Sequence, residues 1–444
     1  MNKEKIKWGI IQPLTGGMYL GAEKAIGHPA EWVISYPGLT DYIKDKNGNV
    51  IDAANERNIF NYLKKKNRLP AWYYMNMHYL NNDEMLQDTE YHPEYTLHEE
   101  QVGQYSEQPN LFGIDLVCAV PVCAGLSMAS TANEERKCQC NEQMIWMTNY
   151  ALKTIKPKIY LFENAPTLMS SRGDDVRDQL ETVAMENGYS IVYYKTDTKY
   201  HNNCQKRPRT FIFFFRHRNG EKFIPEMQYE HITATVEEFF GRLGSEDSPL
   251  QINDPMNVTM DNYTNVDVLL HYLVARFGAN WREWMHGDLC DFLATNMEER
   301  AKFLEWLSEN EDSKQYNWYV KHFEHCDTKA AEGKGWWSTA AKYFNNDCIP
   351  ACMYKNVPVV VHHKEDRLYT MREWFYTMGH PTDMNMVGNP VHYFRKMGQN
   401  VPANTARWVA EEAARIIENW DTLNSNDRGQ NVAFFDNTKQ KRIW

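Results

Sequence analysis

Short apolar runs alternate with amphipathic segments along the first half of the chain. Lys5–Ile11 and Phe112–Val120 are predicted strands, and the second is almost continuously apolar, as is typical of a buried parallel strand. Helical spacing follows the first strand from Thr15 to Ile26 and the second from Gln143 to Ile155. Lys158–Phe162 then predicts the next strand.

The same alternation continues toward the middle of the chain. Asp175–Glu186 is a predicted helix that ends before Gly188. Ile191–Tyr194 and Thr210–Phe215 are predicted strands, and we expect these two to form an antiparallel end to the sheet. Repetition of strand, helix and strand predicts a doubly wound, Rossmann-like α/β sheet.

The pattern divides the chain into four segments. Residues 1–220 form the first, and residues 221–360, which are rich in Trp, His and Asn with irregular periodicity, form a separate unit. Regular spacing returns in residues 361–420, which we expect to complete the first unit. Val357–His362 is a predicted strand, Thr370–Thr377 a helix start and Asn404–Trp420 a helix. Residues 421–444 are polar and predict a flexible tail.

Composition narrows the class of protein. The 48 basic and 59 acidic residues give a net charge of −11, which argues against a surface that binds nucleic acid everywhere but permits a local basic cleft. Nine cysteines, an odd number, fit a reducing cytoplasm better than a disulfide framework. The longest apolar run, Leu116–Leu126, is too short to cross a membrane and contains Pro121, so we expect no membrane partner.

Three segments carry chemistry. Cys123 lies in the loop beyond the strand Phe112–Val120, at the edge where open α/β sheets bind ligands, although a free cysteine is more often a buried structural residue. Glu163 and Asn164 end an apolar strand, where burial would raise a carboxyl pKa, but such a pair can also stabilise a turn.

The third segment is Gln205-Lys-Arg207-Pro-Arg209. Arginines at alternate positions of an extended segment share one face and can contact phosphates or a base carbonyl. A solvated basic turn is the alternative.

In order and spacing, these segments resemble the cytosine-C5 DNA methyltransferase family. There, a cysteine loop precedes Glu-Asn-Val, Gln-x-Arg-x-Arg, a variable target-recognition region, Arg-x-x-Thr-x-Arg-Glu and a Gly-Asn-x-Val-Pro helix start. Arg367–Glu373 with Gly379-His-Pro381 corresponds to the penultimate motif, and Gly398–Pro402 to the last. Gly16-Gly17 corresponds to the glycine-rich cofactor loop, so the resemblance extends from about residue 6 to residue 418.

The resemblance implies a class I methyltransferase fold, with a catalytic domain at 1–220, a smaller target-recognition domain at 221–360 and a return segment at 361–420. Cys123 would add to C6 of cytosine, Glu163 would protonate N3, and Arg209 with Arg207 would contact O2 and the loop backbone. Asn164, Gln205 and Ser127 are the implied substrate-binding residues. The implied cofactor-binding residues are Thr15, Gly16, Gly17, Tyr36, Gln399 and Asn400.

The implied reaction uses S-adenosylmethionine and double-stranded DNA with a flipped cytosine. We expect a monomer in the cytoplasm of a bacterial or phage-infected cell, as in restriction-modification. We expect no metal: His322, His325, Cys326, Cys348 and Cys352 lack the usual zinc spacing.

Departures from the family pattern gather at the cofactor motifs. Where the family has Asp-Leu-Phe-x-Gly-x-Gly-Gly, this chain has Ile10-Ile-Gln12-Pro-Leu-Thr-Gly16-Gly17. Near Ser35-Tyr36-Pro37 there is no carboxylate for a ribose until Asp41, and Gly398-Gln399-Asn400 replaces Gly-Asn-x. Three alternatives to plain DNA methylation therefore remain: alkylation from a modified sulfonium donor, a catalytically silent DNA-binding relative, and an RNA cytosine methyltransferase.

Overall fold

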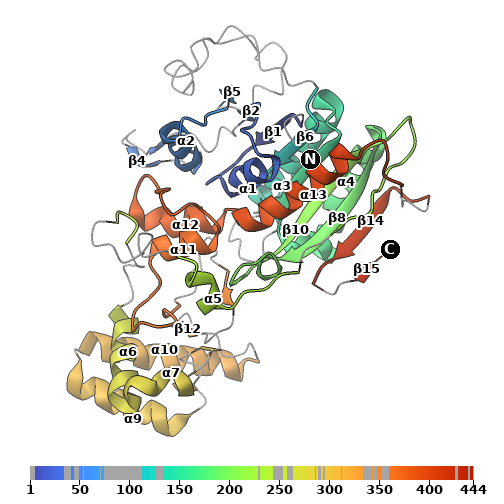
Figure 1. Ribbon diagram of the computed structural model, residues 1–444. Helices are drawn as coiled ribbons and strands as arrows, with labels where there is room; N and C mark the ends of the chain where they lie inside the picture. Colours follow the sequence, from blue (N-terminus) through green and yellow to red (C-terminus); the bar gives the residue numbers. More distant parts are fainter. Residues whose placement is uncertain are drawn as a thin grey trace.

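The computed structural model shows a large α/β unit and a smaller helical unit (Figure 1). The structure describes residues 6–34, 42–44, 50–53, 55–70, 72–74, 113–121, 123, 125–126, 134–228, 231–243, 254–257, 264–285, 287–288, 292–293, 296–311, 313–333, 342–343, 348–351, 360–425, 429–438 and 441–443.

A nine-stranded sheet forms the centre of the large unit, in the order β15-β14-β8-β10-β7-β6-β1-β2-β5. The strands are β1 (Trp8–Ile11), β2 (Trp32–Ile34), β5 (Trp72–Tyr74), β6 (Leu116–Ala119), β7 (Ile159–Asn164), β8 (Tyr189–Asp197), β10 (Pro208–Arg216), β14 (Val432–Asp436) and β15 (Lys441–Ile443). Strand β10 runs antiparallel to both β7 and β8, which confirms the predicted antiparallel pairing, but β14 and β15 lie beyond β8, so this pair is not the end of the sheet.

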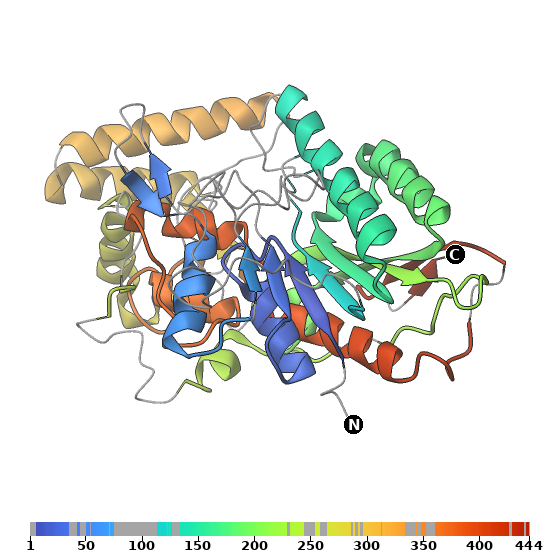
Figure 2. The same ribbon diagram turned by 90° about the horizontal axis from the view of Figure 1, so that it is seen from above.

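Helices cover both faces of the sheet, as Figure 2 shows. One face packs against α1 (Gly17–Ile26) and α13 (Ala403–Glu418). The other packs against α3 (Glu134–Tyr150), its π-helical continuation and α4 (Asp174–Glu186). Alternate residues of β10 divide between the two cores, because successive side chains of a strand point to opposite faces. The doubly wound α/β prediction is confirmed.

The polar tail predicted at residues 421–444 is wrong. Strand β14 pairs in parallel with β8, and β15 pairs with β14, so the segment extends the sheet. Phe435 and Ala433 are buried beside α13, and the Phe434 ring stacks on Tyr193 at 5.1 Å between centroids. A short apolar run inside a polar segment was enough to form a strand, because the uncovered edge of β8 supplied its hydrogen-bond partners.

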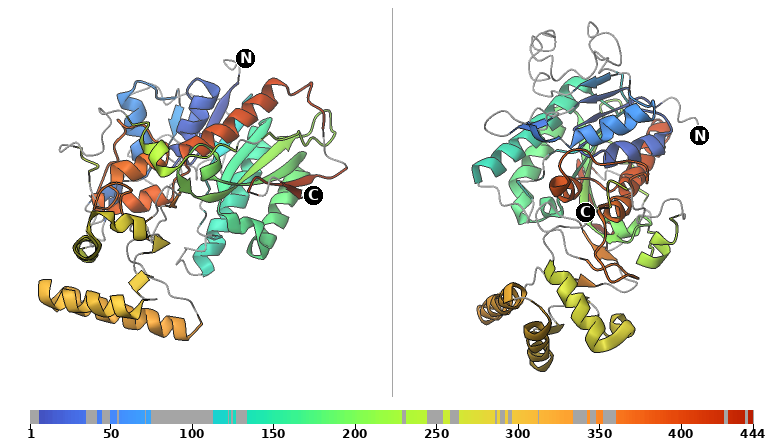
Figure 3. Two further views of the ribbon diagram at one scale, coloured as in Figure 1. Left: turned by 60° about the horizontal axis from the view of Figure 1, so that its bottom comes forward. Right: turned by 90° about the vertical axis from the view of Figure 1, so that its left-hand side faces the viewer.

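The helical unit has a core of its own and lies to one side of the sheet (Figures 1 and 3). It contains α6 (Thr264–Phe277), α7 (Trp281–Trp284), α9 (Met297–Asn310) and α10 (Ser313–Ala331). The unit begins later than residue 221, the predicted boundary, because Phe223, Ile224 and helix α5 (Val236–Phe240) pack into the core of the large unit.

The return segment also differs from prediction in one element. Instead of the strand predicted at Val357–His362, its described part forms one isolated bridge between Val361 and Leu368. Helix α11 (Met371–Thr377) follows as predicted, and Thr370 and Glu373 form a capping box at its start. Other elements of the described chain are β3 (Tyr42–Lys44), β4 (Val50–Ala53), α2 (Glu56–Lys65), β9 (Gln205–Lys206), β11 (Gly287–Asp288), β12 (Lys342–Tyr343), β13 (Ile349–Pro350) and α12 (Tyr393–Gly398).

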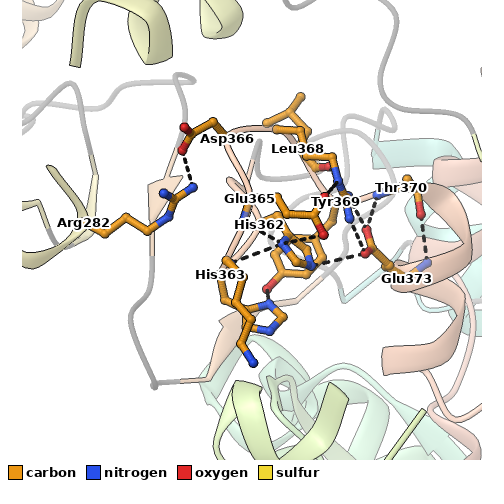
Figure 4. Close-up of polar contacts among 11 residues, drawn as sticks. Arg282, His362, His363, Glu365, Asp366, Leu368, Tyr369, Thr370 and Glu373 are labelled. Atoms are coloured by element: carbon orange, nitrogen blue, oxygen red, sulfur yellow. Dashed lines mark hydrogen bonds and ion pairs between the residues drawn. The ribbon is translucent and has the colours of Figure 1, made fainter. Parts of the chain in front are cut away.

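A polar network holds the turn between the two units (Figure 4). His362 Nδ1 accepts hydrogen bonds from the backbone of Lys364 and Glu365, so Nε2 carries the proton that faces Glu373, 3.3 Å away. Arg367 donates two hydrogen bonds to the same carboxylate, at 2.8 and 2.9 Å. On the helical side, Arg282 pairs with Asp366.

None of the helices in the described ranges combines the length and the apolar character needed to span a lipid bilayer.

Candidate functional site

Cys123 and Glu163, two of the predicted site residues, lie at the carboxyl edge of the parallel strands. Strand β1 lies between β2 and β6, so the order of strands reverses there and the connections leave toward opposite faces. Such a reversal leaves a crevice in which open α/β sheets bind ligands. Cys123 follows β6, and Glu163 is the penultimate residue of β7.

Cys123 is partly buried and packs against the core beneath α3 and α4. Its carbonyl accepts a hydrogen bond from the backbone N–H of Leu126 at 3.0 Å, which closes a tight turn just beyond the strand. Ser127, the predicted substrate contact in the same loop, lies outside the described residues.

The pairing of strands brings Glu163 and Arg209 together. Because β10 is antiparallel to β7, the start of β10 meets the end of β7, and Phe211 lies opposite Glu163. Arg209, two residues earlier, therefore reaches the same edge from the neighbouring strand. Its Nε lies 2.5 Å from Glu163 Oε1, and both side chains are largely buried.

Charges at this edge act on one another. Burial raises the pKa of the Cys123 thiol, the Glu163 carboxyl raises it further, and the guanidinium groups of Arg209 and Arg207 lower it. Burial also raises the pKa of Glu163, against the opposing effect of both arginines. The structure thus combines a thiol, an acid that holds its proton more strongly than usual, and a cation in one cluster, Cys123–Glu163–Arg209.

Two other predicted substrate contacts have structural partners. Asn164 accepts a hydrogen bond from the Ala165 backbone at 2.8 Å and lies 3.2 Å from the sulfur of Met144. Gln205 donates from Nε2 to the Thr377 hydroxyl at 3.0 Å, and this ties β9 to α11.

Arg207 connects this edge with the last motif of the chain. Its guanidinium donates to the carbonyls of Gly398 and Asn400 at 2.7 and 2.8 Å, and its backbone N–H donates to Asp197 at 3.0 Å. The side chain is almost completely buried. These contacts join the start of β10 to the last motif.

The glycine-rich loop lies against that same last motif. Thr15 donates to the Lys396 carbonyl at 3.1 Å, and the Gly17 N–H donates to the Asn400 side chain at 3.0 Å. A Cβ on Gly17 would stand 1.8 Å from the Val401 carbonyl oxygen, so only glycine permits this approach. The structure therefore brings Thr15, Gly16, Gly17 and Asn400 together.

Gln399, a further predicted cofactor residue, has a different partner. Gln399 accepts a hydrogen bond from the Asn55 side chain at 2.6 Å, which joins the last motif to the start of α2. Tyr36 lies outside the described residues.

Sequence reasoning missed the roles of His380 and Gln12. His380 is buried, stacks on Phe375 with ring centroids 4.0 Å apart, and pairs through Nε2 with the Asn400 amide. Burial lowers the pKa of His380 to about 3, so the ring is neutral. Gln12 directly follows β1 and is completely buried. A polar residue at the end of a buried strand was the available sequence signal.

In the part of the chain that the structure describes, no group of three or more His, Cys, Asp or Glu side chains is arranged to hold a metal ion. Of the residues considered for zinc, His322 and Cys326 approach each other on α10, with 3.8 Å between Nε2 and Sγ.

Comparison with protein families gives a match to the model for C-5 cytosine-specific DNA methylase over residues 81–415. The matched range includes Cys123, Glu163 and Arg209 but begins after the glycine-rich loop. No curated protein sequence matches the chain significantly.

Among solved structures, one described as a DNA modification methyltransferase encoded within an E. coli prophage is 16% identical, with a TM-score of 0.50 over 93% of this chain and 100% of that one. The Entamoeba histolytica methyltransferase EhMeth is 10% identical, with a TM-score of 0.48 over 92% of this chain and 97% of that one. The S. pombe Dnmt2 methyltransferase is 12% identical, with a TM-score of 0.45 over 94% and 99%. At such low identity, the first likeness shows the fold alone, and it confirms the predicted class I methyltransferase fold.

Proposed function

This chain belongs to the C-5 cytosine-specific DNA methylase family and is a DNA (cytosine-5-)-methyltransferase, and from that premise we propose how it works. We propose that it transfers a methyl group from S-adenosylmethionine to a cytosine swung out of double-stranded DNA, through a covalent bond to Cys123. The observation that carries the proposal is the Cys123–Glu163–Arg209 cluster. In it the Glu163 carboxyl raises the pKa of the Cys123 thiol and the Arg209 guanidinium lowers it.

The chemistry requires this set of groups. C5 of cytosine is a weak nucleophile, and addition of a thiolate at C6 makes it enamine-like. In the proposed first step, the Cys123 sulfur bonds to C6 as Glu163 gives its proton to N3. The raised pKa of Glu163 suits this step, because the carboxyl keeps its proton at higher pH than an ordinary glutamate.

The remaining steps restore the aromatic base. C5 takes up the methyl group, the C5 proton is lost to a base, the S–C6 bond breaks and N3 returns its proton to Glu163. Arg209, held against Glu163 at 2.5 Å, is positioned to donate a hydrogen bond to the O2 atom, where negative charge gathers. The target must leave the duplex, because C6 is inaccessible in a stacked base pair.

The residues at the end of β1 fit a donor of this class. Within the described part of the chain, the buried amide of Gln12 has no hydrogen-bond partner, and Thr15 and Asn400 hold the loop after it in shape. Thr15, Gly16, Gly17, Asn400 and Gln12 would hold S-adenosylmethionine, which supplies an electrophilic methyl group when bound.

The helical unit would supply DNA recognition. It has a separate core and joins the sheet unit through the turn that contains His362 and Asp366. A recognition surface on its own core can vary without disturbing the reactive cluster, because packing energy is local to each unit.

Trapping with 5-fluorocytosine tests the proposal. Fluorine at C5 cannot leave as a proton does, so the enzyme should remain bonded to a DNA duplex containing the analogue when S-adenosylmethionine is added. We expect an adduct that survives denaturing electrophoresis with the wild type and with the control Cys138→Ser, which removes an exposed cysteine on α3, and none with Cys123→Ser.

Mass spectrometry of nucleosides from treated DNA separates the alternatives. We expect 5-methylcytosine. A heavier C5 substituent would support a modified sulfonium donor, and a wild type that gives neither adduct nor modified base would support the silent relative. Adduct formation on RNA in preference to DNA would overturn the DNA substrate.

A further inference from the structure

The residue that closes β1 combines two features that are costly in a folded protein. Gln12 has a backbone φ of 58°, in the left-handed region that residues other than glycine rarely adopt. Its backbone N–H donates to the Ile34 carbonyl at 2.6 Å, so pairing between β1 and β2 fixes the residue at the carboxyl edge of the sheet.

The side chain of Gln12 lacks what buried amides normally have. It is 0% exposed, and neither its Nε2 nor its Oε1 has a hydrogen-bond partner among the residues that the structure describes. Buried polar groups in folded proteins are nearly always hydrogen-bonded, because an unpaired one keeps its full desolvation cost. An apolar side chain of similar size would avoid that cost. Folding alone therefore does not explain a glutamine at this position.

Two polar side chains of the adjacent loops, Thr15 and Asn400, are hydrogen-bonded. Thr15 donates to the Lys396 carbonyl, and Asn400 accepts from the Gly17 backbone. Asn58 on α2, another completely buried amide, has partners on both sides: Nδ2 donates to the Asn55 carbonyl at 2.8 Å and Oδ1 accepts from the Val387 backbone at 2.6 Å. The unpaired amide and the unusual backbone coincide at Gln12, at the strand end where open sheets bind ligands.

We propose that Gln12 is a binding residue for the donor, and that its amide makes hydrogen bonds with a polar group of that molecule in both directions. The inference rests on the proposed function, because it takes the ligand at this edge to be an adenosyl sulfonium compound. An amide offers a donor and an acceptor side by side, and so do the edge of an adenine base and the amino-acid group of S-adenosylmethionine.

The prediction separates stability from binding. Gln12→Leu removes an unpaired buried amide, so the ligand-free variant should melt at the same temperature as the wild type or higher. The same variant should bind S-adenosylhomocysteine about tenfold more weakly or worse in calorimetric titration, because both hydrogen bonds to the ligand are lost. Asn58→Leu is the matched control, and it should lower the melting temperature because it breaks two existing hydrogen bonds.

A second ligand identifies which part of the donor Gln12 contacts. Methylthioadenosine keeps the nucleoside but lacks the amino-acid group. If Gln12→Leu weakens its binding by the same factor, the contact is to the nucleoside, and if that variant binds it like the wild type, the contact is to the amino-acid group. Either result supports the inference.

Three results would contradict the proposals, and they distinguish the role of Gln12 from the identity of the donor. Equal affinity of the wild type and Gln12→Leu for S-adenosylhomocysteine overturns the role of Gln12. So does a fall in melting temperature as large as that of Asn58→Leu with unchanged affinity, since it shows a structural role. A wild type that binds no S-adenosylhomocysteine overturns the proposed donor itself.

Discussion

Opposing charges control the thiol at the centre of the site. Burial and the Glu163 carboxyl raise the pKa of Cys123, whereas Arg209 and Arg207 lower it. Protonation of Glu163, the form that the proposed first step needs, removes that negative charge and so favours the reactive thiolate. Nucleophile and acid are therefore coupled, and a change to one alters the other.

Glu163→Gln should separate reactivity of the thiol from turnover. Loss of the carboxyl charge lowers the pKa of Cys123, so iodoacetamide should alkylate it several-fold faster at pH 7.5, since each pKa unit is about a tenfold change in thiolate. Methylation should fall by roughly 10²-fold or more, because an amide cannot give N3 a proton. Peptide-resolved mass spectrometry measures the alkylation, with Cys138 as internal reference.

The control for that prediction is Glu181→Gln, which removes a partly buried carboxyl on α4. It should change neither rate. Slower alkylation of Cys123 in Glu163→Gln would contradict the electrostatic coupling.

At this scale the sequence predicted residue types better than roles. The order of motifs selected Cys123, Glu163 and Arg209, and antiparallel pairing of β10 with β7 explains why the last two meet. Periodicity cannot show that Arg207 is buried against the carbonyls of Gly398 and Asn400, because those partners lie far away in the sequence. The unpaired amide of Gln12 was hidden for the same reason.

Strand β14 depends on the edge of β8, a strand that lies far away in the sequence. Its two adjacent phenylalanines point to opposite faces of the sheet: Phe435 is buried in the core beside α13, and Phe434 is partly buried against Tyr193. The composition of residues 421–444 suggested a tail, because a five-residue run carries a weak signal. What composition could not reveal was the open edge of β8 that pairs with it.

Truncation of these two rings tests whether β14 is part of the folded sheet in solution. Phe435→Ala should lower the free energy of unfolding by ~3 kcal/mol, as expected for a buried phenylalanine, and Phe434→Ala by a smaller amount. Urea unfolding followed by tryptophan fluorescence measures both. Wild-type stability in the two variants would mean that the segment is a free tail after all.

Across the whole molecule, the boundary between the two units lies where the chain changes core rather than where its composition changes. Val361 and Leu368 pack with the helical unit, whereas the adjacent Val360 and Tyr369 pack with the sheet unit. Composition placed the boundary at residue 221, because the sequence from Phe223 to α5 lacks regular spacing. This segment is buried because it fits the shape of the sheet unit, and a local sequence pattern does not predict that shape.

Groups buried in their uncharged or paired forms make the molecule sensitive to acid. Burial lowers the pKa of His380 to about 3, and burial with a nearby His231 lowers the pKa of His201 to about 3. Burial alone would raise the pKa of Glu373, but hydrogen bonds from Arg367 and His362 outweigh it and lower the pKa to about 2. Each of these groups binds its proton less strongly in the folded protein than in the unfolded chain.

Stability should therefore fall as the pH falls, in two stages. Below about pH 6.5 the unfolded chain protonates both histidines while the folded protein does not, which costs up to ~1.4 kcal/mol per pH unit for each ring until pH nears 3. Below about pH 4.5 the carboxyl of Glu373 adds its own loss, which continues toward pH 2.

His201→Gln isolates one proton of that dependence. The ring of His201 lies buried against the Thr196 hydroxyl at 2.7 Å. A glutamine takes up no proton in either state, so between pH 6 and pH 4 the slope of unfolding free energy against pH should decrease by about 1.4 kcal/mol per unit. Urea titrations at four pH values measure the slope, and a variant with the wild-type slope would show that His201 is protonated in the folded protein. Because the slope counts protons rather than contacts, the result stands even if the substitution itself destabilises the fold.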